Sequence, residues 1–449
     1  MTETKKFGYT LRVMEKSITP GKLAGTVRIP GSKSHTIRAL LIATLADGTS
    51  TIRDPLYSAD TRSCIAACRI FGATIDETPE IITVQGIGGH PKPPAEPVDV
   101  GNSGTTLYLA VGLAALVHGS TEFTGDAQTK ARPIGPLLDS LQDLGANIEY
   151  LAKPGFPPFR ITGPIRGGHT SIECKTSQYL SSLLLALPLT PAGSEDSRIS
   201  VPLLNEKPYV DITLAWLADQ GIVPQHNNYD NWIVAPGASF KAFDKPIAGD
   251  FSSATFLLCA AAMTGSKLRL EGLDMNDSQG DKAVVAIMQQ MGCTVTIENF
   301  AITIIGPGHP ECPARQLSGG EFDLNAIPDA LPALSVCGAC AAEEVRLINV
   351  PQARLKETDR IACMAAELTK LQVAADELPD GLVIHPAAAG KAPFAGTHVH
   401  GHGDHRIVMS MAIAGLAADS PVTVDTAETA GITFPDFFPT LAALRTKVE

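Results

Sequence analysis

The sequence lacks the features that would take this chain to a membrane or to a nucleic acid. No stretch approaches the eighteen or so uninterrupted apolar residues of a membrane span, and the N-terminal MTETKKFGYTLRVMEKSITP has no apolar core of a signal peptide. Basic residues are in deficit, because 35 Lys and Arg face 47 Asp and Glu and the formal net charge is -12. We therefore expect a cytoplasmic protein with no membrane or nucleic-acid partner.

The cysteines and histidines lack the arrangement of a disulfide framework or a metal site. The nine cysteines are scattered through apolar helical segments, so we expect reduced, buried thiols. Cys337 and Cys340 form a Cys-x-x-Cys pair, but no second pair follows at zinc-site spacing. HGHGDH at 400–405 fits the HxHxDH pattern of metallo-β-lactamase-like hydrolases. No histidine occurs after His405 to complete such a site, so we expect no metal.

What the sequence does contain is a unit that recurs six times. Helix openings begin near residues 32, 102, 176, 251, 328 and 403, at spacings of 70, 74, 75, 77 and 75. Each unit holds an Ala- and Leu-rich helix, a short strand, a polar loop and a second helix. The second helix closes on a signature such as FGATI or MGCTV, whose glycine is expected to cap it. In the fifth unit Gln372 takes the place of that glycine.

The repeat predicts an α/β fold with small-residue helices inside and strands around them. Its period exceeds that of common solenoids, so we expect two lobes of three units each. Pro and Gly residues predict crossings between the lobes near Gly31 and near Ala248–Gly249. We expect one discontinuous lobe of residues 1–31 and 249–449, an inserted lobe of residues 32–248, and an active site in the cleft between them.

Each opening places Ser, Thr, Asn or Asp at a helix start, where free N–H groups and the helix dipole favour anions. For a single opening, an ordinary N-cap is the simpler interpretation. Basic residues recur at these ends, however, in GSKSHTIRAL (31–40), TKARPIG (129–135), RLKETDRI (354–361) and GDHRI (403–407). RLKETDRI alone is more typical of a solvated helix face. The recurrence in an acidic chain favours substrates that carry carboxylates and phosphates.

Two expectations follow from this concentration of charge. Asp329 in NAIPDALPAL is either an N-cap or, beside several cations, an ionised carboxylate that can act as a base. The cations come from different units, so we expect them to repel one another and to hold the lobes apart until anions fill the cleft.

Ten motifs in order along the chain resemble the 5-enolpyruvylshikimate-3-phosphate (EPSP) synthase family. They are GSKSxxxRAL, GNSGTT, KxRPIG, SQYL, KPYVDIT, GDxSSA, IPD, LKETDR, GDHR and TFPDFF. The resemblance implies two lobes of three βαβαββ units. It also implies transfer of the enolpyruvyl group of phosphoenolpyruvate to the 5-hydroxyl of shikimate 3-phosphate, with release of phosphate, in aromatic amino-acid biosynthesis. It further implies a monomer that needs no metal or cofactor and that glyphosate inhibits.

The resemblance assigns roles to individual residues. The expected phosphoenolpyruvate ligands are Lys33, Gly104, Arg132, Gln178, Arg360 and Arg406. The expected shikimate 3-phosphate ligands are Lys33, Ser34, Arg38, Thr176, Ser177, Gln178, Tyr209, Asp329, Gln352 and Lys356. Addition followed by elimination requires a base on the hydroxyl, for which Asp329 is expected, and proton transfer at the methylene carbon, for which Glu357 and Lys33 are expected.

The chain departs from the family pattern at four positions. Tyr108 stands where an arginine is common, Gln352 replaces an asparagine and Ile432 lies where some members have a lysine. Glu206 replaces a phosphate-binding serine and brings a negative charge near the expected phosphate. We expect Glu206 to turn away and pair with Lys207 or Lys356, leaving Thr176, Ser177 and the lysine to hold the phosphate; otherwise the acceptor is not shikimate 3-phosphate.

Two other functions are weighed against this one. A related transferase that acts on UDP-N-acetylglucosamine has Lys-Asn where this chain has Lys33-Ser34, and it has a loop cysteine that GDAQTKARPIG (125–135) lacks. A non-catalytic anion-binding protein of the same fold would be expected to lose Asp329, Glu357 or Lys33, and all three are present. A coupled assay of phosphate release separates the three possibilities.

Overall fold

Helices that are apolar on every side form the interior of the molecule. The computed structural model describes residues 14–388 and 391–446. Nearly every residue is buried in its inner helices, which are α1 (Lys33–Leu45), α3 (Gly104–Ala114), α6 (Gln178–Ala186), α8 (Phe251–Thr264), α10 (Leu331–Ala339) and α12 (His405–Ala414). Small apolar side chains around the whole circumference leave these helices no polar face, so neighbours must cover them on all sides.

The remaining helices are amphipathic and bury one side only. They are α2 (Ala59–Ile70), α4 (Ala127–Lys130), α5 (Gly135–Asp143), α7 (Lys207–Asp219), α9 (Ala283–Gln290), α11 (Arg360–Lys370) and α13 (Phe437–Leu444). In α11, for example, Ile361, Met364 and Leu368 are buried at a spacing of three and four residues.

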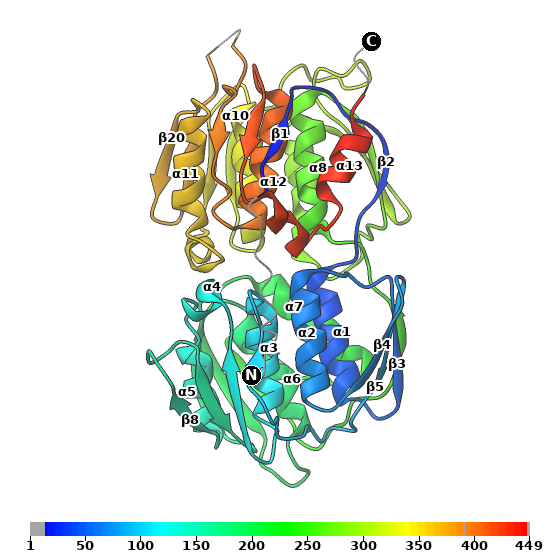
Figure 1. Ribbon diagram of the computed structural model, residues 1–449, viewed down its shortest axis with the longest axis vertical. Helices are drawn as coiled ribbons and strands as arrows, with labels where there is room; N and C mark the ends of the chain where they lie inside the picture. Colours follow the sequence, from blue (N-terminus) through cyan, green and yellow to red (C-terminus); the bar gives the residue numbers. More distant parts are fainter. Residues whose placement is uncertain (1–13, 389–390, 447–449) are drawn as a thin grey trace, which may run out of the picture.

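Small sheets lie outside the helices, and those with four strands share one topology. In each, a parallel pair is followed by an antiparallel strand and a hairpin partner. The lower lobe of Figure 1 holds β14 (Asp244–Pro246), β3 (Thr49–Arg53), β5 (Ile81–Gln85), β4 (Thr74–Glu77); β6 (Val98–Asp99), β7 (Ser120–Thr124), β9 (Phe159–Thr162), β8 (Asn147–Tyr150); and β10 (His169–Cys174), β11 (Ser197–Leu204), β13 (Asn231–Val234), β12 (Gln225–Asn227).

The upper lobe repeats the arrangement. Its sheets are β2 (Ala24–Arg28), β15 (Lys267–Glu271), β17 (Ala301–Ile305), β16 (Thr294–Glu298); β18 (Gly320–Asp323), β19 (Val345–Ile348), β21 (Gly381–Ile384), β20 (Ala375–Leu378); and β22 (His398–Val399), β23 (Val422–Val424), β1 (Lys16–Ile18). The described residues thus contain six sheets. The predicted six-fold repeat is confirmed, with β1 completing the last sheet in place of a hairpin.

The chain passes between the lobes twice, and the two crossings lie side by side. One hydrophobic core runs from Ile37 to Ile247, and the other combines Ile18–Ile29 with residues 251–444. At the crossings Ser32 N donates to Ala248 O at 2.8 Å and Asp250 N donates to Pro30 O at 2.9 Å. A Cβ on Gly31 would lie 2.4 Å from Asp54 O, so only glycine fits this close approach.

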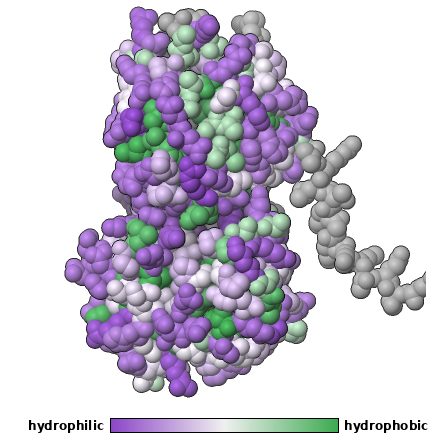
Figure 2. All heavy atoms as spheres, turned by 90° about the vertical axis from the view of Figure 1, so that its left-hand side faces the viewer, coloured by the Kyte–Doolittle hydropathy of each residue, from purple (hydrophilic) through white to green (hydrophobic). Residues whose placement is uncertain are grey.

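The surface carries small, separate apolar areas among polar ones (Figure 2). The large exposed hydrophobic residues are scattered: Met14, Leu151, Leu203, Val223, Ile297, Phe300 and Leu355. Across residues 14–388 and 391–446, no helix has both the length and the apolar character needed to cross a bilayer.

The second helices of five units end in the same backbone motif, as their glycines predict. In each, the residue after the left-handed position donates its N–H five residues back, for example Ala73 N to Cys68 O at 3.1 Å and Val373 N to Leu368 O at 2.9 Å. The left-handed residue is Gly72, Gly145, Gly221, Gly292 or Gln372. Gln372 therefore holds a φ of 63° that favours glycine.

We expect Gln372→Gly to raise the free energy of unfolding by about 0.5–1 kcal/mol, because it removes the cost of a left-handed side chain and that gain exceeds the entropy added to the unfolded chain. Gln372 is exposed, so little packing is lost. The matched control is Gly221→Gln, where φ is 75° and a Cβ meets nothing within 4 Å. It should lower stability by about 1 kcal/mol. Denaturant titration measures both, and equal stability in all three proteins would contradict the prediction.

Candidate active site

A narrow cavity lies between the lobes, where the first turns of several inner helices meet. Its volume is about 50 Å³. Its lining residues are Lys33, Ser34, Arg38, Thr105, Arg132, Ser177, Gln178, Glu206, Tyr209, Asp329, Lys356, Glu357, Arg360, His405 and Arg406. The N-terminal turns of α1, α3, α6 and α12 contribute to this wall. Their dipoles and the basic side chains make the cavity favourable for anions.

The residues expected to contact substrates all lie at this boundary between the lobes. Those missing from the cavity lining are close to it. Thr176 and Gln352 line an adjoining cavity that shares Lys356 with the first. Gly104 lies against Arg132, so that a Cβ on the glycine would come within 2.0 Å of the Nη1 atom of the arginine.

Asp329 lies at the centre of the basic residues, in η3 (Pro328–Ala330) just before α10. Its Oδ1 is 2.7 Å from Arg360 Nη1, and its Oδ2 is 2.9 Å from Arg406 Nη2. Burial alone raises the pKa of the carboxyl group, but Arg406, Lys356 and Arg360 outweigh burial and hold the pKa of Asp329 well below its usual range. Asp329 is therefore an ionised carboxylate.

Glu357 joins two of the arginines. Its Oε1 is 3.1 Å from Arg132 Nη2, and its Oε2 pairs with Arg360. Burial opposes ionisation, but Arg360 and Arg132 keep the pKa of Glu357 well below its usual range. Asp404, the N-cap of α12, holds Arg360 from the other side with an Oδ2 to Nε distance of 2.8 Å. The guanidinium of Arg360 is thus fixed by three carboxylates.

The expected repulsion between the cations is wrong, because carboxylates of the chain itself compensate it. Lys33 Nζ is 3.0 Å from Asp60 Oδ2 within the lower lobe. The Arg132–Glu357 pair crosses the boundary between the lobes, as does the hydrogen bond of 2.8 Å from the Tyr209 hydroxyl to Asp281 Oδ2. The two lobes are therefore in contact at the site without a ligand's charge between them.

Two arginines keep donors for a further anion. Arg132 and Arg406 are 7% and 3% exposed. Among the described residues, Nε of Arg132 and both Nε and Nη1 of Arg406 meet no hydrogen-bond acceptor. Buried donors are rarely left in this state, so these groups point to an anionic ligand.

Arg38 is held by neutral groups. Its Nε donates to Thr213 Oγ1 at 2.8 Å, its Nη1 to Ser34 O at 3.0 Å and its Nη2 to Tyr209 O at 2.9 Å. Burial lowers the pKa of Arg38 to about 10. The guanidinium is thus positioned by its donors and carries a charge that no carboxylate neutralises in these contacts.

Glu206 behaves only partly as expected. It pairs with Lys356, which is one of the two predicted partners. It does not leave the neighbouring hydroxyls free, because its Oε2 accepts hydrogen bonds from Thr176 Oγ1 at 3.1 Å, Ser177 Oγ at 3.1 Å and Ser177 N at 3.3 Å. The reason is local: Glu206 is 1% exposed, and these are the donors next to its carboxylate.

The other departures from the family pattern are packed as neutral groups. The Tyr108 hydroxyl donates to Pro133 O at 3.1 Å, and burial raises the pKa of Tyr108 to about 12. Gln352 Nε2 donates to Asn325 O at 2.9 Å. Ile432 is a buried apolar residue at the end of η6 (Ala427–Ile432).

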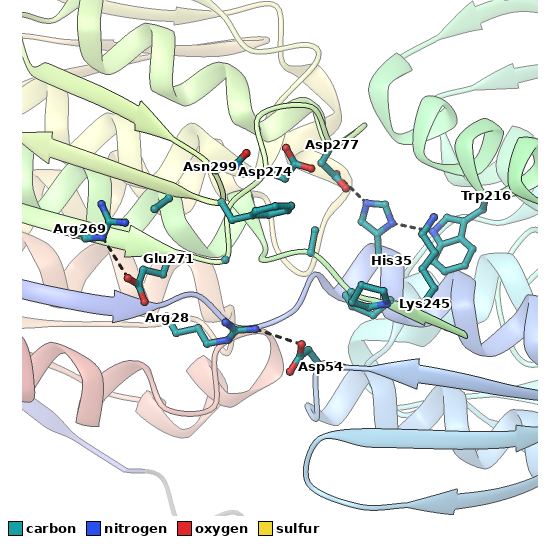
Figure 3. Close-up of a pocket in the computed structure, with 16 residues that line it drawn as sticks. Arg28, His35, Asp54, Trp216, Lys245, Arg269, Glu271, Asp274, Asp277 and Asn299 are labelled. Atoms are coloured by element: carbon teal, nitrogen blue, oxygen red, sulfur yellow. Dashed lines mark hydrogen bonds and ion pairs between the residues drawn. The ribbon is translucent and has the colours of Figure 1, made fainter. Parts of the chain in front are cut away.

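A second groove between the lobes, of about 520 Å³, lies beside the crossings (Figure 3). Trp216 Nε1 donates to His35 Nδ1 at 2.9 Å, which leaves Nε2 of His35 to donate to Asp277 Oδ1 at 3.0 Å in the other lobe. Arg28 of the upper lobe pairs with Asp54 of the lower at 3.3 Å. This groove contains contacts that join the lobes and none of the residues expected to bind substrates.

The histidines of HGHGDH are separated by their partners. His400 Nδ1 lies 2.6 Å from Asp425 Oδ2, His402 Nε2 lies 2.7 Å from Glu367 Oε1, and His405 faces the cavity. Within the described parts of the chain, no three His, Cys, Asp or Glu side chains could hold a metal ion together. All nine cysteines are free.

Three residues at the site were not anticipated from the sequence: Thr105, Asp281 and Asn325. Thr105 and Asn325 are uncharged and leave no signal in a search for basic clusters. Asp281 lies in η2 (Gly280–Lys282), immediately before α9. The loops before the second helices of units two, three and five supply Arg132, Glu206 and Lys356, so aligning the repeats would have drawn attention to Asp281.

Comparisons with known proteins agree on one family. A family model described as EPSP synthase (3-phosphoshikimate 1-carboxyvinyltransferase) matches residues 18–441. A 3-phosphoshikimate 1-carboxyvinyltransferase of Acetivibrio thermocellus is 46% identical over 420 residues, which cover 94% of this chain and 96% of the relative. One of Ruminiclostridium cellulolyticum is 46% identical over 427 residues, covering 95% and 97%. A solved EPSP synthase of Acinetobacter baumannii is 28% identical, covering 97% and 99%, with a TM-score of 0.81.

We expect Asp281→Asn to stabilise the protein at pH 8 and to have little effect near pH 4. Burial, together with Asp329 and Asp250, raises the pKa of Asp281 to about 7, while Arg406 and Tyr209 act against this rise. The folded state therefore holds this proton more tightly than the unfolded state, and stability falls as pH rises from about 4 to 7. The amide does not ionise, so the gain at pH 8 should be about 2–4 kcal/mol.

Denaturant titration at pH 4, 6 and 8 tests this prediction, with Asp436→Asn as the control at an exposed carboxylate. A gain for Asp281→Asn that is the same at all three pH values would contradict it.

Proposed function

This chain belongs to the EPSP synthase family, and we propose that the cavity between its lobes is where it carries out that family's reaction. The chain transfers the enolpyruvyl group of phosphoenolpyruvate to the 5-hydroxyl of shikimate 3-phosphate and releases phosphate. The observation that carries the assignment to this cavity is the convergence of Lys33, Arg132, Arg360 and Arg406 around the ionised Asp329.

The phosphoenolpyruvate side of the site is assigned to Lys33, Gly104, Arg132, Gln178, Arg360 and Arg406. Phosphoenolpyruvate carries a carboxylate and a phosphate, and planar guanidinium groups bind both through paired hydrogen bonds. The free donors of Arg132 and Arg406 support this assignment, because a dianion would give them acceptors. Gly104 contributes by letting Arg132 lie close to the start of α3.

The acceptor side is assigned to Lys33, Ser34, Arg38, Thr176, Ser177, Gln178, Tyr209, Asp329, Gln352 and Lys356. Thr176, Ser177 and Lys356 form a compact group of hydroxyl and ammonium donors suited to a phosphate. Asp329 accepts a hydrogen bond of 3.5 Å from Tyr209, so an acceptor hydroxyl in this region would meet the carboxylate. Gln352 approaches through its contact with Asn325.

The proton transfers follow from the ionisation of these groups. In the addition step Asp329 takes the hydroxyl proton while the oxygen bonds to the central carbon of phosphoenolpyruvate, and a proton reaches the methylene carbon, with Lys33 as the donor. In the elimination step Glu357 removes a proton from the new methyl group as the carbon–phosphate oxygen bond breaks. The hydroxyl proton finally leaves on inorganic phosphate, so the reaction balances. Arg360 stabilises both carboxylates between the steps.

The finer points of setting and partners belong to the same proposal. We place the protein in the cytoplasm, which the nine unpaired thiols support. We infer a monomer, because the exposed apolar residues are scattered instead of forming one large patch. Glyphosate is proposed as an inhibitor that competes with phosphoenolpyruvate. UDP-N-acetylglucosamine as acceptor is not favoured by the family to which the chain belongs.

A coupled assay of phosphate release tests the proposed function. Phosphoenolpyruvate with shikimate 3-phosphate should release phosphate, and phosphoenolpyruvate with UDP-N-acetylglucosamine should not. Release with the second acceptor alone would assign the chain to the other transferase.

We expect Asp329→Asn and Glu357→Gln each to lower kcat by about 10²–10⁴-fold, because each removes a proton-transfer group with almost no change of shape. Asp436→Asn, at an exposed position, is the matched control and should keep the activity of the parent. Circular dichroism checks that the variants fold. A folded variant with near-normal turnover would remove that residue from the mechanism.

We expect Gly104→Ala to raise KM for phosphoenolpyruvate by about tenfold or more and to weaken glyphosate, since the new methyl group would displace the Arg132 guanidinium. KM for shikimate 3-phosphate should change much less. Gly112→Ala would disturb the same helix away from the site, where its Cβ meets Ser182 O at 2.6 Å, and it serves as the control for a general effect on α3. Unchanged KM for phosphoenolpyruvate in Gly104→Ala would contradict the role of Arg132.

A further inference from the structure

Glu206 places a carboxylate on the groups that the proposed function assigns to the acceptor phosphate. We propose that Glu206 is an internal anion that shikimate 3-phosphate must displace, so that the acceptor binds by exchanging one anion for another. The inference rests on the proposed function, because that function assigns Thr176, Ser177 and Lys356 to the phosphate.

The hydrogen bonds make the two anions mutually exclusive. Glu206 Oε2 accepts from Thr176 Oγ1 and from Ser177 Oγ, each at 3.1 Å. A hydroxyl has a single hydrogen to donate, so neither side chain can donate to a phosphate while it donates to Glu206. Glu206 Oε1 meanwhile takes the ammonium of Lys356 as its ion-pair partner. A phosphate beside this carboxylate would meet like charge and find its donors engaged.

The backbone holds Glu206 in this position. Its φ is 58°, in the left-handed region that non-glycine residues rarely adopt. Its N–H donates to Asn325 Oδ1 at 3.4 Å in the upper lobe, and Asn325 Nδ2 donates to Asn205 Oδ1 at 3.1 Å. The loop before α7 is thus attached to the opposite lobe, and the carboxylate it carries is 1% exposed.

Displacement also breaks a contact between the lobes. Thr176 and Ser177 belong to the lower lobe, and Lys356 lies in the upper lobe 3.9 Å from Asp329. A phosphate can replace the carboxylate because it offers more acceptor oxygens and more negative charge to the same three groups. Shikimate has no phosphate and cannot make this exchange. Glu206 therefore lowers the apparent affinity for shikimate 3-phosphate by the fraction of molecules in which it occupies the site.

Direct binding measurements test the exchange. Calorimetry with shikimate 3-phosphate, and separately with shikimate, is run on the parent protein, Glu206→Ser and Glu206→Gln. Glu206→Gln keeps the shape of the side chain and serves if Glu206→Ser fails to fold. Glu173→Gln is the control, because Glu173 is an exposed carboxylate of the same lobe.

We expect the Kd for shikimate 3-phosphate to fall about tenfold in Glu206→Ser and less in Glu206→Gln, which keeps an amide oxygen as acceptor but loses the ion pair. The Kd for shikimate should change by less than about twofold. Glu173→Gln should match the parent. An unchanged or weaker affinity for shikimate 3-phosphate in both folded Glu206 variants would overturn the proposal, as would an equal gain in affinity for shikimate. Failure of the proposed function is seen separately, as absence of phosphate release by the parent protein.

Discussion

The site depends on a balance of buried charges that neither lobe achieves alone. Arg360 contacts Asp329, Glu357 and Asp404, and Arg132 of the other lobe completes the set through Glu357. Ion pairs withdrawn from water are stable only while every partner is present. The same carboxylates that perform the proposed proton transfers therefore also bring the lobes into contact. Catalysis and closure share one set of groups in this molecule.

The fold could be predicted from the sequence because its cause is local and repeated. Apolar residues on every side of the inner helices, and left-handed residues such as Gly72 after the second helices, recur in each unit and act over a few residues. The residues of the site could be named, but their pairing could not. Ion pairs such as Lys356–Glu206 join positions 150 residues apart, and nothing in either segment specifies the partner. Asp281 was missed for the same reason, because its raised pKa arises from neighbours in other units.

Two sequence patterns show how a motif depends on its surroundings. The carboxylate of Glu206 stands among hydroxyls and a lysine that a phosphate would also use, so a single substitution changes what the ligand must compete with. The histidines of HGHGDH instead secure the loop before α12, since Asp425 and Glu367 hold His400 and His402 on different sides. The loop so fixed carries Asp404, which in turn orients Arg360.

The paired crossings have a consequence for how the chain is made. Strand β2 belongs to the sheet of β15, which follows it by about 240 residues, and β14 is returned to the sheet of β3 only after the whole inserted lobe has been synthesised. A chain emerging from the ribosome can therefore bury the inner helices of the lower lobe early, while its first strand waits without a partner. The earliest segment of the protein is among the last to find its place.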